Sequence, residues 1–197
     1  MFYLFKIERC DAINLLSKHG TFEDAVAAMK ESLAKKIKET KGFSITADDL
    51  TPENADKYSF EFDTDPSFPF DDEKGPVVTA TNYSDDGITE WAIFNVATSS
   101  KFILFKNVED RYMNVLDTYD TYDDAYEAMK EDVAQEVNDT FDEELFDADT
   151  VDDEDGEAED YNVTVISGED STDNGGPVAT ATFCDDEPAY EWRIFRM

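Results

Sequence analysis

The pattern of apolar and polar residues along the chain occurs twice. The segment 2–7, Phe-Tyr-Leu-Phe-Lys-Ile, matches the segment 102–107, Phe-Ile-Leu-Phe-Lys-Asn. Both runs are rich in large apolar residues and alternate only weakly, which predicts a largely buried strand in each. A second, short strand is predicted to follow at Ala12–Leu16 and at Met113–Leu116.

An amphipathic helix is predicted after each strand pair. Thr21 and Thr121 are suitable N-cap residues, and an aspartate follows each of them after three residues (Asp24, Asp124), as in a capping box. Apolar residues then recur with helical spacing, so that each helix has one apolar stripe that packs on a sheet. The stripes contain Phe22, Val26, Met29, Leu33 and Ile37 in the first half, and Tyr122, Tyr126, Met129, Val133 and Val137 in the second.

Three further strands are predicted after each helix, the last two forming a hairpin. Asp85-Asp86-Gly87 is a common hairpin turn sequence, and Asp185–Pro188 takes its place in the second half. Trp91 and Trp192 occupy strand positions beside isoleucines, which favours core anchors over ligand-stacking platforms. The predicted strands are Tyr58–Phe62, Pro76–Tyr83 and Gly87–Val96, then Tyr161–Val165, Pro177–Phe183 and Tyr190–Met197.

The matching blocks keep their order along the chain, at an offset of 100 that becomes 101 towards the end. We therefore predict a tandem duplication of a β-β-α-β-β-β module. The fold class is α+β, with one helix on a face of an antiparallel-leaning sheet in each module. The first repeat is expected at 1–98 and the second, strongly acidic repeat at 101–197.

Charge distinguishes the two repeats. The chain has 49 acidic and 16 basic residues, a net charge of −33, of which −9 falls in residues 1–100 and −24 in residues 101–197. No basic residue lies between Lys130 and Arg193, where there are 23 acids. Such a chain repels nucleic acids and anionic membranes and attracts cationic surfaces, so we expect no direct binding to nucleic acid or membrane.

The divergence is concentrated in the helix and in the segment after it. Four lysines of the first helix (Lys35, Lys36, Lys38, Lys41) face Gln135, Glu136, Asn138 and Phe141, and twelve of the nineteen residues 142–160 are acidic. General adaptation to salt would acidify both copies, and a solvated acidic loop is the simpler alternative. The helical acids recur at steps of three or four residues, which sets carboxylates about 5–6 Å apart, on the scale of nucleic-acid phosphates. The predicted partner-binding residues are Asp120, Asp124, Glu127, Glu131, Asp142, Glu143, Glu144, Asp147, Asp149, Asp152, Asp153, Glu154 and Asp155.

The residue types that most enzymes and metal sites need are missing. His19 is the single histidine, and the two cysteines, Cys10 and Cys184, occupy unrelated positions in the two copies. There is no glycine-rich phosphate loop and no Cys/His zinc spacing. EF-hand windows that start at Asp170 or Val151 each lack a required ligand. We therefore predict no catalytic residue, no cofactor, no metal site and no enzyme activity.

No apolar run approaches the roughly 18–20 residues of a membrane helix, and the first ten residues do not read as a secretory leader. Two unpaired cysteines fit a reducing compartment, so we expect a cytoplasmic protein.

These observations favour an acidic inhibitor or decoy that mimics nucleic-acid charge. Its partner would be a basic nucleic-acid-binding protein, such as a nuclease, an effector or a repressor, whose cationic groove it blocks. In composition and size the chain resembles the DNA-mimic anti-restriction and anti-CRISPR proteins of phages and mobile elements, an analogy that implies the same kind of target. The alternatives are a duplicated protein-interaction module of bacterial or phage origin without mimicry, and a weak divalent-metal binder.

Overall fold

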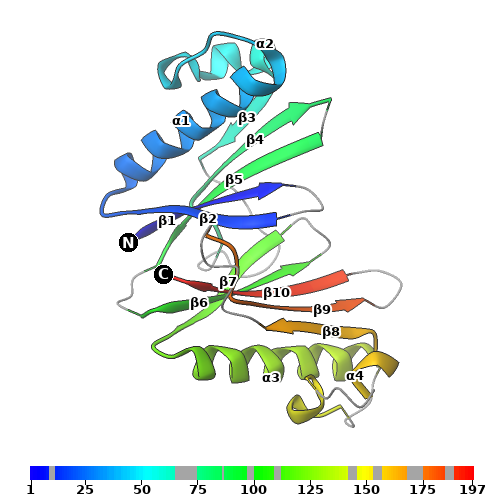
Figure 1. The fold of residues 1–197 in the computed structure, drawn as a ribbon. Helices are drawn as coiled ribbons and strands as arrows, with labels where there is room; N and C mark the ends of the chain where they lie inside the picture. The colour runs from blue at the N-terminus through cyan, green and yellow to red at the C-terminus, as the bar shows by residue number, and fades with distance from the viewer. Residues whose placement is uncertain are drawn as a thin grey trace. The chain divides into compact units, whose positions relative to one another are not determined.

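In the computed structural model, each half of the chain forms a five-stranded antiparallel sheet with one long helix packed on it (Figure 1). The chain divides into two units, Met1–Thr98 and Ser99–Met197, and each is described by itself. The structure describes residues 1–8, 12–64, 75–85, 87–96, 100–108, 112–141, 146–152, 157–167, 175–184 and 189–197.

The first module has the sheet order β2-β1-β5-β4-β3, so the first and last strands are neighbours at the centre. Val96 at the end of this module donates its backbone N–H to the carbonyl of Met1 (2.9 Å). Its elements are β1 (Phe2–Glu8), β2 (Ala12–His19), α1 (Phe22–Lys41), η1 (Ala47–Asp49), η2 (Pro52–Asn54), α2 (Ala55–Tyr58), β3 (Phe60–Asp63), β4 (Val78–Ser84) and β5 (Gly87–Asn95).

The second module repeats this topology in the order β7-β6-β10-β9-β8. Met197 donates to the carbonyl of Lys101 (2.7 Å), as Val96 does to Met1. The first hairpin of each module also shifts register at the same place, between Leu4 and Phe5 and between Leu104 and Phe105. The elements are β6 (Phe102–Val108), β7 (Tyr112–Tyr119), α3 (Tyr122–Phe141), η3 (Ala148–Thr150), α4 (Glu157–Asp160), β8 (Val163–Ser167), β9 (Ala179–Cys184) and β10 (Ala189–Arg196).

This architecture confirms the predicted α+β fold and its element order, with three local corrections. The strands β2 and β7 run on to His19 and Tyr119, several residues beyond the predicted ends. The strands β3 and β8 begin two residues late, because a short helix and a left-handed residue precede each of them. The short helices between the long helix and the third strand were not predicted, because their polar sequences have no apolar period. The predicted turn 185–188 lies outside the described residues.

The helix boundaries follow the predicted capping chemistry. The Thr21 hydroxyl accepts the backbone N–H of Asp24 (3.2 Å), and Thr121 accepts that of Asp124 (3.1 Å). At the other end of α1, Gly42 adopts a left-handed conformation (φ 69°) and donates to the carbonyl of Lys38. Glycine at this position allows the chain to leave the helix without steric strain.

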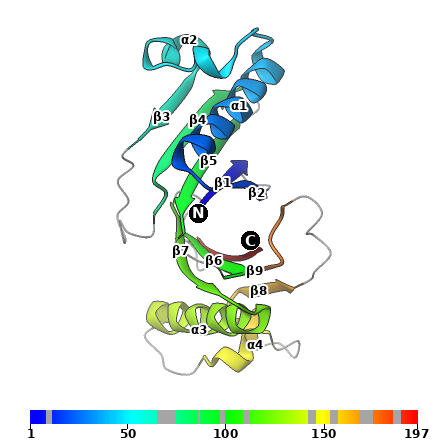
Figure 2. The same cartoon turned by 90° about the vertical axis from the view of Figure 1, so that its left-hand side faces the viewer.

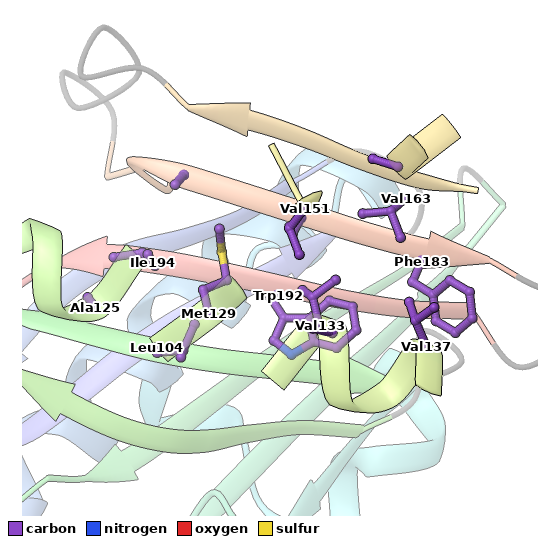
Figure 3. Close-up of a cluster of buried hydrophobic side chains, with 14 of the residues drawn as sticks. Leu104, Ala125, Met129, Val133, Val137, Val151, Val163, Phe183, Trp192 and Ile194 are labelled. Carbon is purple, nitrogen blue, oxygen red and sulfur yellow. The ribbon is translucent and has the colours of Figure 1, made fainter. Parts of the chain in front are cut away.

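The core of each module lies between the long helix and one face of the sheet. In the second module, Met129, Val133 and Val137 of α3 face Trp192 and the other core side chains of the sheet (Figure 3). Trp91 and Trp192 are both 0% exposed, which confirms them as core anchors. Fully burying one large apolar side chain stabilises a fold by about 1.5–3 kcal/mol, so this layer supplies the main driving force for folding.

The first predicted position of the stripe is wrong in the first module and lies at the edge of the core in the second. Phe22 is 37% exposed, whereas Tyr122 is half-buried and packs against the core. Ala25 and Ala125, three residues further on, are fully buried. Small residues there let the helix approach the sheet closely, and the ring of Phe22 packs at the edge against Phe2.

The sheet face away from the helix is also apolar near its centre. Phe5 and Phe94 pack edge to face with ring centroids 5.8 Å apart, and Phe105 and Phe195 repeat this pair at 5.7 Å.

Among the described residues, no helix has both the length and the apolar character to cross a membrane.

A strained backbone position in the first module generates a stability prediction. Ser59 and Asn162 are equivalent and adopt left-handed conformations (φ 55° and 56°), which asparagine tolerates better than serine. We expect Ser59→Gly to raise the free energy of unfolding of the first module by about 0.5–1 kcal/mol, and Asn162→Gly to change the second by less. Each module holds one tryptophan, so urea titrations followed by the indole N–H resonances of Trp91 and Trp192 report on each separately. A destabilised Ser59→Gly variant would contradict this interpretation.

Candidate acidic interface

The outward face of α3 is acidic along its length. Asp124, Glu127 and Glu131 are exposed on the face opposite the core, and Asp123 is exposed beside them in the first turn. The last turn of α3 contains no basic residue, whereas that of α1 contains Lys38 and Lys41. Figure 2 shows α3 along its full length, with the short turns that follow it lying against it.

Several of the predicted partner-binding residues lie on or close to α3, and others lie outside the described residues. Asp147, Asp149 and Asp152 lie in or beside η3, which packs on α3. Asp120 lies two residues before the helix. The remaining predicted residues, Asp142, Glu143, Glu144, Asp153, Glu154 and Asp155, lie outside the described residues.

A buried lysine organises part of this surface. The ammonium group of Lys130 lies 3.2 Å from a carboxylate oxygen of Glu127 and 3.7 Å from one of Asp152, and its side chain is only 7% exposed. The Tyr126 hydroxyl donates to Asp152 Oδ2 (3.3 Å), and Lys130 Nζ lies 5.7 Å from the Tyr126 ring centroid. Glu127 and Asp152, both predicted as partner contacts, are therefore partly neutralised within the module.

Burial and neighbouring charges shift the pKa values of Lys130 and Tyr126 in this cluster. Burial lowers the pKa of Lys130, but the hydrogen bond to Glu127 and the charge of Asp152 outweigh it and hold the pKa above its usual range. Burial and the adjacent charge of Asp152 together raise the pKa of Tyr126 to about 12. The lysine therefore stays protonated and the tyrosine stays neutral at physiological pH.

Two more predicted acids have local structural roles. Asp124 accepts a hydrogen bond from the Thr121 hydroxyl and belongs to the helix cap. Asp147 is the N-cap of η3 and accepts the backbone N–H of Asp149 (3.1 Å). Carboxylates at such positions interact favourably with the free N–H groups of a helix start.

A second ionic cluster ties α3 to the sheet. Lys106 Nζ lies 2.8 Å from Asp132 Oδ2 and 2.6 Å from Glu136 Oε2, and the Trp192 indole donates to the same Asp132 oxygen (2.7 Å). Burial lowers the pKa of Lys106, but the hydrogen bonds and charges of Asp132 and Glu136 more than compensate, so its pKa is raised. Glu136 therefore serves the fold of its own module.

In the first module, the acceptor of the indole N–H is neutral, and one acid pairs with two lysines between the sheet and the helix. Trp91 donates to the Ser32 hydroxyl (2.9 Å), and Glu8 accepts from both Lys6 (2.7 Å) and Lys36 (3.2 Å). Where the first module has an acid on β1 and a lysine on α1, the second has Val108 on β6 and Glu136 on α3. The lysine-to-glutamate difference at this helix position is a change in an internal ion pair.

Another of the helix differences also has an internal role. The Asn138 side chain donates to the carbonyl of Phe146 (2.8 Å) and accepts its N–H (3.0 Å). The lysine at the equivalent position, Lys38, cannot make this two-way contact, because its ammonium group has no acceptor. Asn138 thus fixes the residues that enter η3.

Six exposed acids of the second module remain after these internal contacts. Within the described residues, these are the carboxylates that make no hydrogen bond or ion pair: Asp120, Asp123, Glu131, Asp139, Asp149 and Asp160. Asp123 was not in the predicted set, although its place in the first helical turn marks it as exposed. Asp120, Glu131 and Asp149 are therefore the described members of the predicted interface that have no such contact, and Asp123 and Asp139 add to the exposed acids of α3.

Comparisons with known proteins provide no further assignment: no family model, curated protein or solved structure matches the chain. Among the residues that the structure describes, no group of three or more His, Cys, Asp or Glu side chains is arranged to hold a metal ion.

The Lys106 cluster predicts unequal effects of removing equivalent lysines. Lys106→Met leaves Asp132 and Glu136 close together and half-buried without a cation, so we expect a loss of about 2–4 kcal/mol in the unfolding free energy of the second module. Lys6→Met leaves Glu8 paired with Lys36 and should cost the first module less than about 1 kcal/mol. Urea titration with the two indole resonances measures both. Equal losses would contradict the assigned roles.

Tyr126 generates a prediction about alkaline pH. A phenol with a pKa near 12 should remain neutral while exposed tyrosines ionise near pH 10. In a spectrophotometric titration at alkaline pH, Tyr126→Phe should remove an ionisation step near pH 12. Because the pKa is raised in the folded state, its contribution to stability is complete below pH 10 and is lost as the pH rises towards 12. An unchanged titration curve would show that Tyr126 is not the shielded tyrosine.

Proposed function

We propose that the second module is an acidic decoy that occupies the cationic groove of a nucleic-acid-binding protein. The observation that carries this proposal is a set of exposed acids just before α3, on α3 and on η3 whose carboxylates make no hydrogen bond or ion pair among the described residues: Asp120, Asp123, Glu131, Asp139 and Asp149. A nuclease, an effector or a repressor provides a groove of the required charge.

The first module is an internal reference for this surface. Its corresponding helix face carries Ala27 in place of Glu127 and Lys35 in place of Gln135, so acids and bases are mixed there. The two modules share a fold and differ in the charge of this face, which supports a role for the charge itself. A dense acidic surface attracts cationic proteins over long distances and accelerates their association at low salt.

The internal contacts also supply rigidity, which a mimic of a stiff polymer needs. Lys130 joins α3 to the residue that follows η3 through Asp152, and Asn138 fixes Phe146 before η3. The exposed Asp149 is held between these two attachments. Preorganised charges bind without the entropic cost of ordering a flexible acidic loop.

Position-matched triple variants test the proposal. The variant Asp123→Asn/Glu131→Gln/Asp149→Asn removes three exposed carboxylates from the second module, and Glu23→Gln/Glu31→Gln/Asp48→Asn removes the carboxylates at the equivalent positions of the first. Each immobilised full chain is incubated with lysate of the source organism at about 50 mM and about 300 mM salt, with and without competing duplex DNA. We expect the wild type and the first-module variant to retain a nucleic-acid-binding protein at low salt. DNA should release it, and the second-module variant should retain about tenfold less.

Two results would contradict the decoy. One is a partner whose retention is indifferent to salt and to DNA, which would indicate a module that binds through apolar contacts. The other is an equal loss of retention in the two triple variants, which would indicate a response to net charge alone.

A further inference from the structure

The first module contains a cavity of about 810 Å³ beside its edge strand β3. The wall is formed by α1, the segment from Leu50 to Ala55, and the strands β3 and β4, and much of it is apolar, including Phe60 and Phe62. Lys30 of α1 contributes a basic group to this wall. Sites for small molecules commonly have volumes of about 300–1,000 Å³ and such a mixture of apolar walls and few polar groups.

The second module shows what the same lysine does when carboxylates are present. Lys130 is equivalent to Lys30 in the helix, and it is buried against Glu127 and Asp152. The positions of these two acids are occupied in the first module by Ala27 and Thr51. Thr51 lines the cavity. The first module therefore has an open space at the position where Asp152 of the second module pairs with Lys130.

Lys30 itself has an incomplete environment. Its ammonium group lies 5.6 Å from the ring centroid of Phe62, and no described carboxylate forms an ion pair with it. A cation that faces an apolar wall and a cavity is a favourable partner for an incoming carboxylate, because a charge-assisted hydrogen bond is stronger when it is shielded from water.

The other charges on the wall restrict the ligand. Asp56 and Glu61 also line the cavity, and Glu61 accepts a hydrogen bond from the Tyr83 hydroxyl (2.9 Å). These two carboxylates repel each negative charge that a ligand carries, and only one charge can pair with Lys30. Multiply charged anions such as phosphate are therefore disfavoured more than a monocarboxylate. The lining therefore fits a ligand with a single negative charge and an apolar body.

We propose that this cavity binds a small molecule that carries one carboxylate on an apolar body. The carboxylate pairs with Lys30 Nζ in the place that Asp152 takes at Lys130 in the second module, and the apolar body packs on Phe60 and Phe62. This site is in the first module and does not depend on the decoy function of the second.

Three probes test the charge requirement on the full chain. 3-Phenylpropanoate has the proposed chemistry, phenethylamine has the same ring with the opposite charge, and inorganic phosphate is an anion without an apolar body. In ¹H–¹⁵N NMR titrations, 3-phenylpropanoate should produce saturable shifts centred on Lys30 and Phe62, and the other two should not. Saturable binding of phenethylamine with equal affinity, or no saturable binding of 3-phenylpropanoate, would overturn the proposal.

Two variants test the role of the lysine. Lys30→Gln removes the positive charge of the side chain. Ala27→Glu introduces a carboxylate that can pair with Lys30, as Glu127 pairs with Lys130 in the second module. Ala27 is exposed on the helix, so this change leaves the core intact. Each variant should weaken 3-phenylpropanoate binding at least about tenfold. The control Lys35→Gln removes an exposed lysine of the same helix and should leave binding unchanged. Unaltered binding in both test variants would overturn the assignment of Lys30.

Discussion

The hydrogen bond from a buried tryptophan to the long helix is the constraint on which the rest of each module depends. Trp91 and Trp192 lie at the centre of the sheet, and a buried indole N–H needs an acceptor. The first module supplies a neutral one, Ser32. The second supplies Asp132, whose charge in a half-buried place requires a cation, and Lys106 provides it. Lys106 also pairs with Glu136, so in the second module the acceptor of the indole N–H belongs to the ion cluster that joins α3 to the sheet.

Much of the fold follows from the sequence because its apolar residues are regularly spaced. Local patterns with strong physical causes predict the strand positions, the helix caps at Thr21 and Thr121, and the core tryptophans. The short helices escaped prediction because three or four polar residues carry no period. Phe22 was assigned to the stripe because a large aromatic residue is a stronger apolar signal than Ala25, although Ala25 is the residue that is fully buried.

The sequence predicts that the candidate interface is acidic, but it does not predict which of its acids pair with lysines of the same module. Counting charges finds the acidic face of α3, but it cannot tell which acids are already used. The position of Lys130 gave one indication, because helical spacing places it beside the apolar residues Val133 and Val137 rather than on the outer face. A lysine at such a position in a very acidic module needs carboxylate partners. The acids nearest to it are the ones least available to another protein.

The ends of each module give the duplication a simple physical basis. Met1 and Val96 are hydrogen-bonded neighbours in the first module, as Lys101 and Met197 are in the second. A unit that starts and finishes at one place can be copied in tandem with only a few residues of connecting chain, because no segment has to span the domain to reach the next copy. The same closure makes either module a suitable cassette for insertion into a surface loop of an unrelated protein.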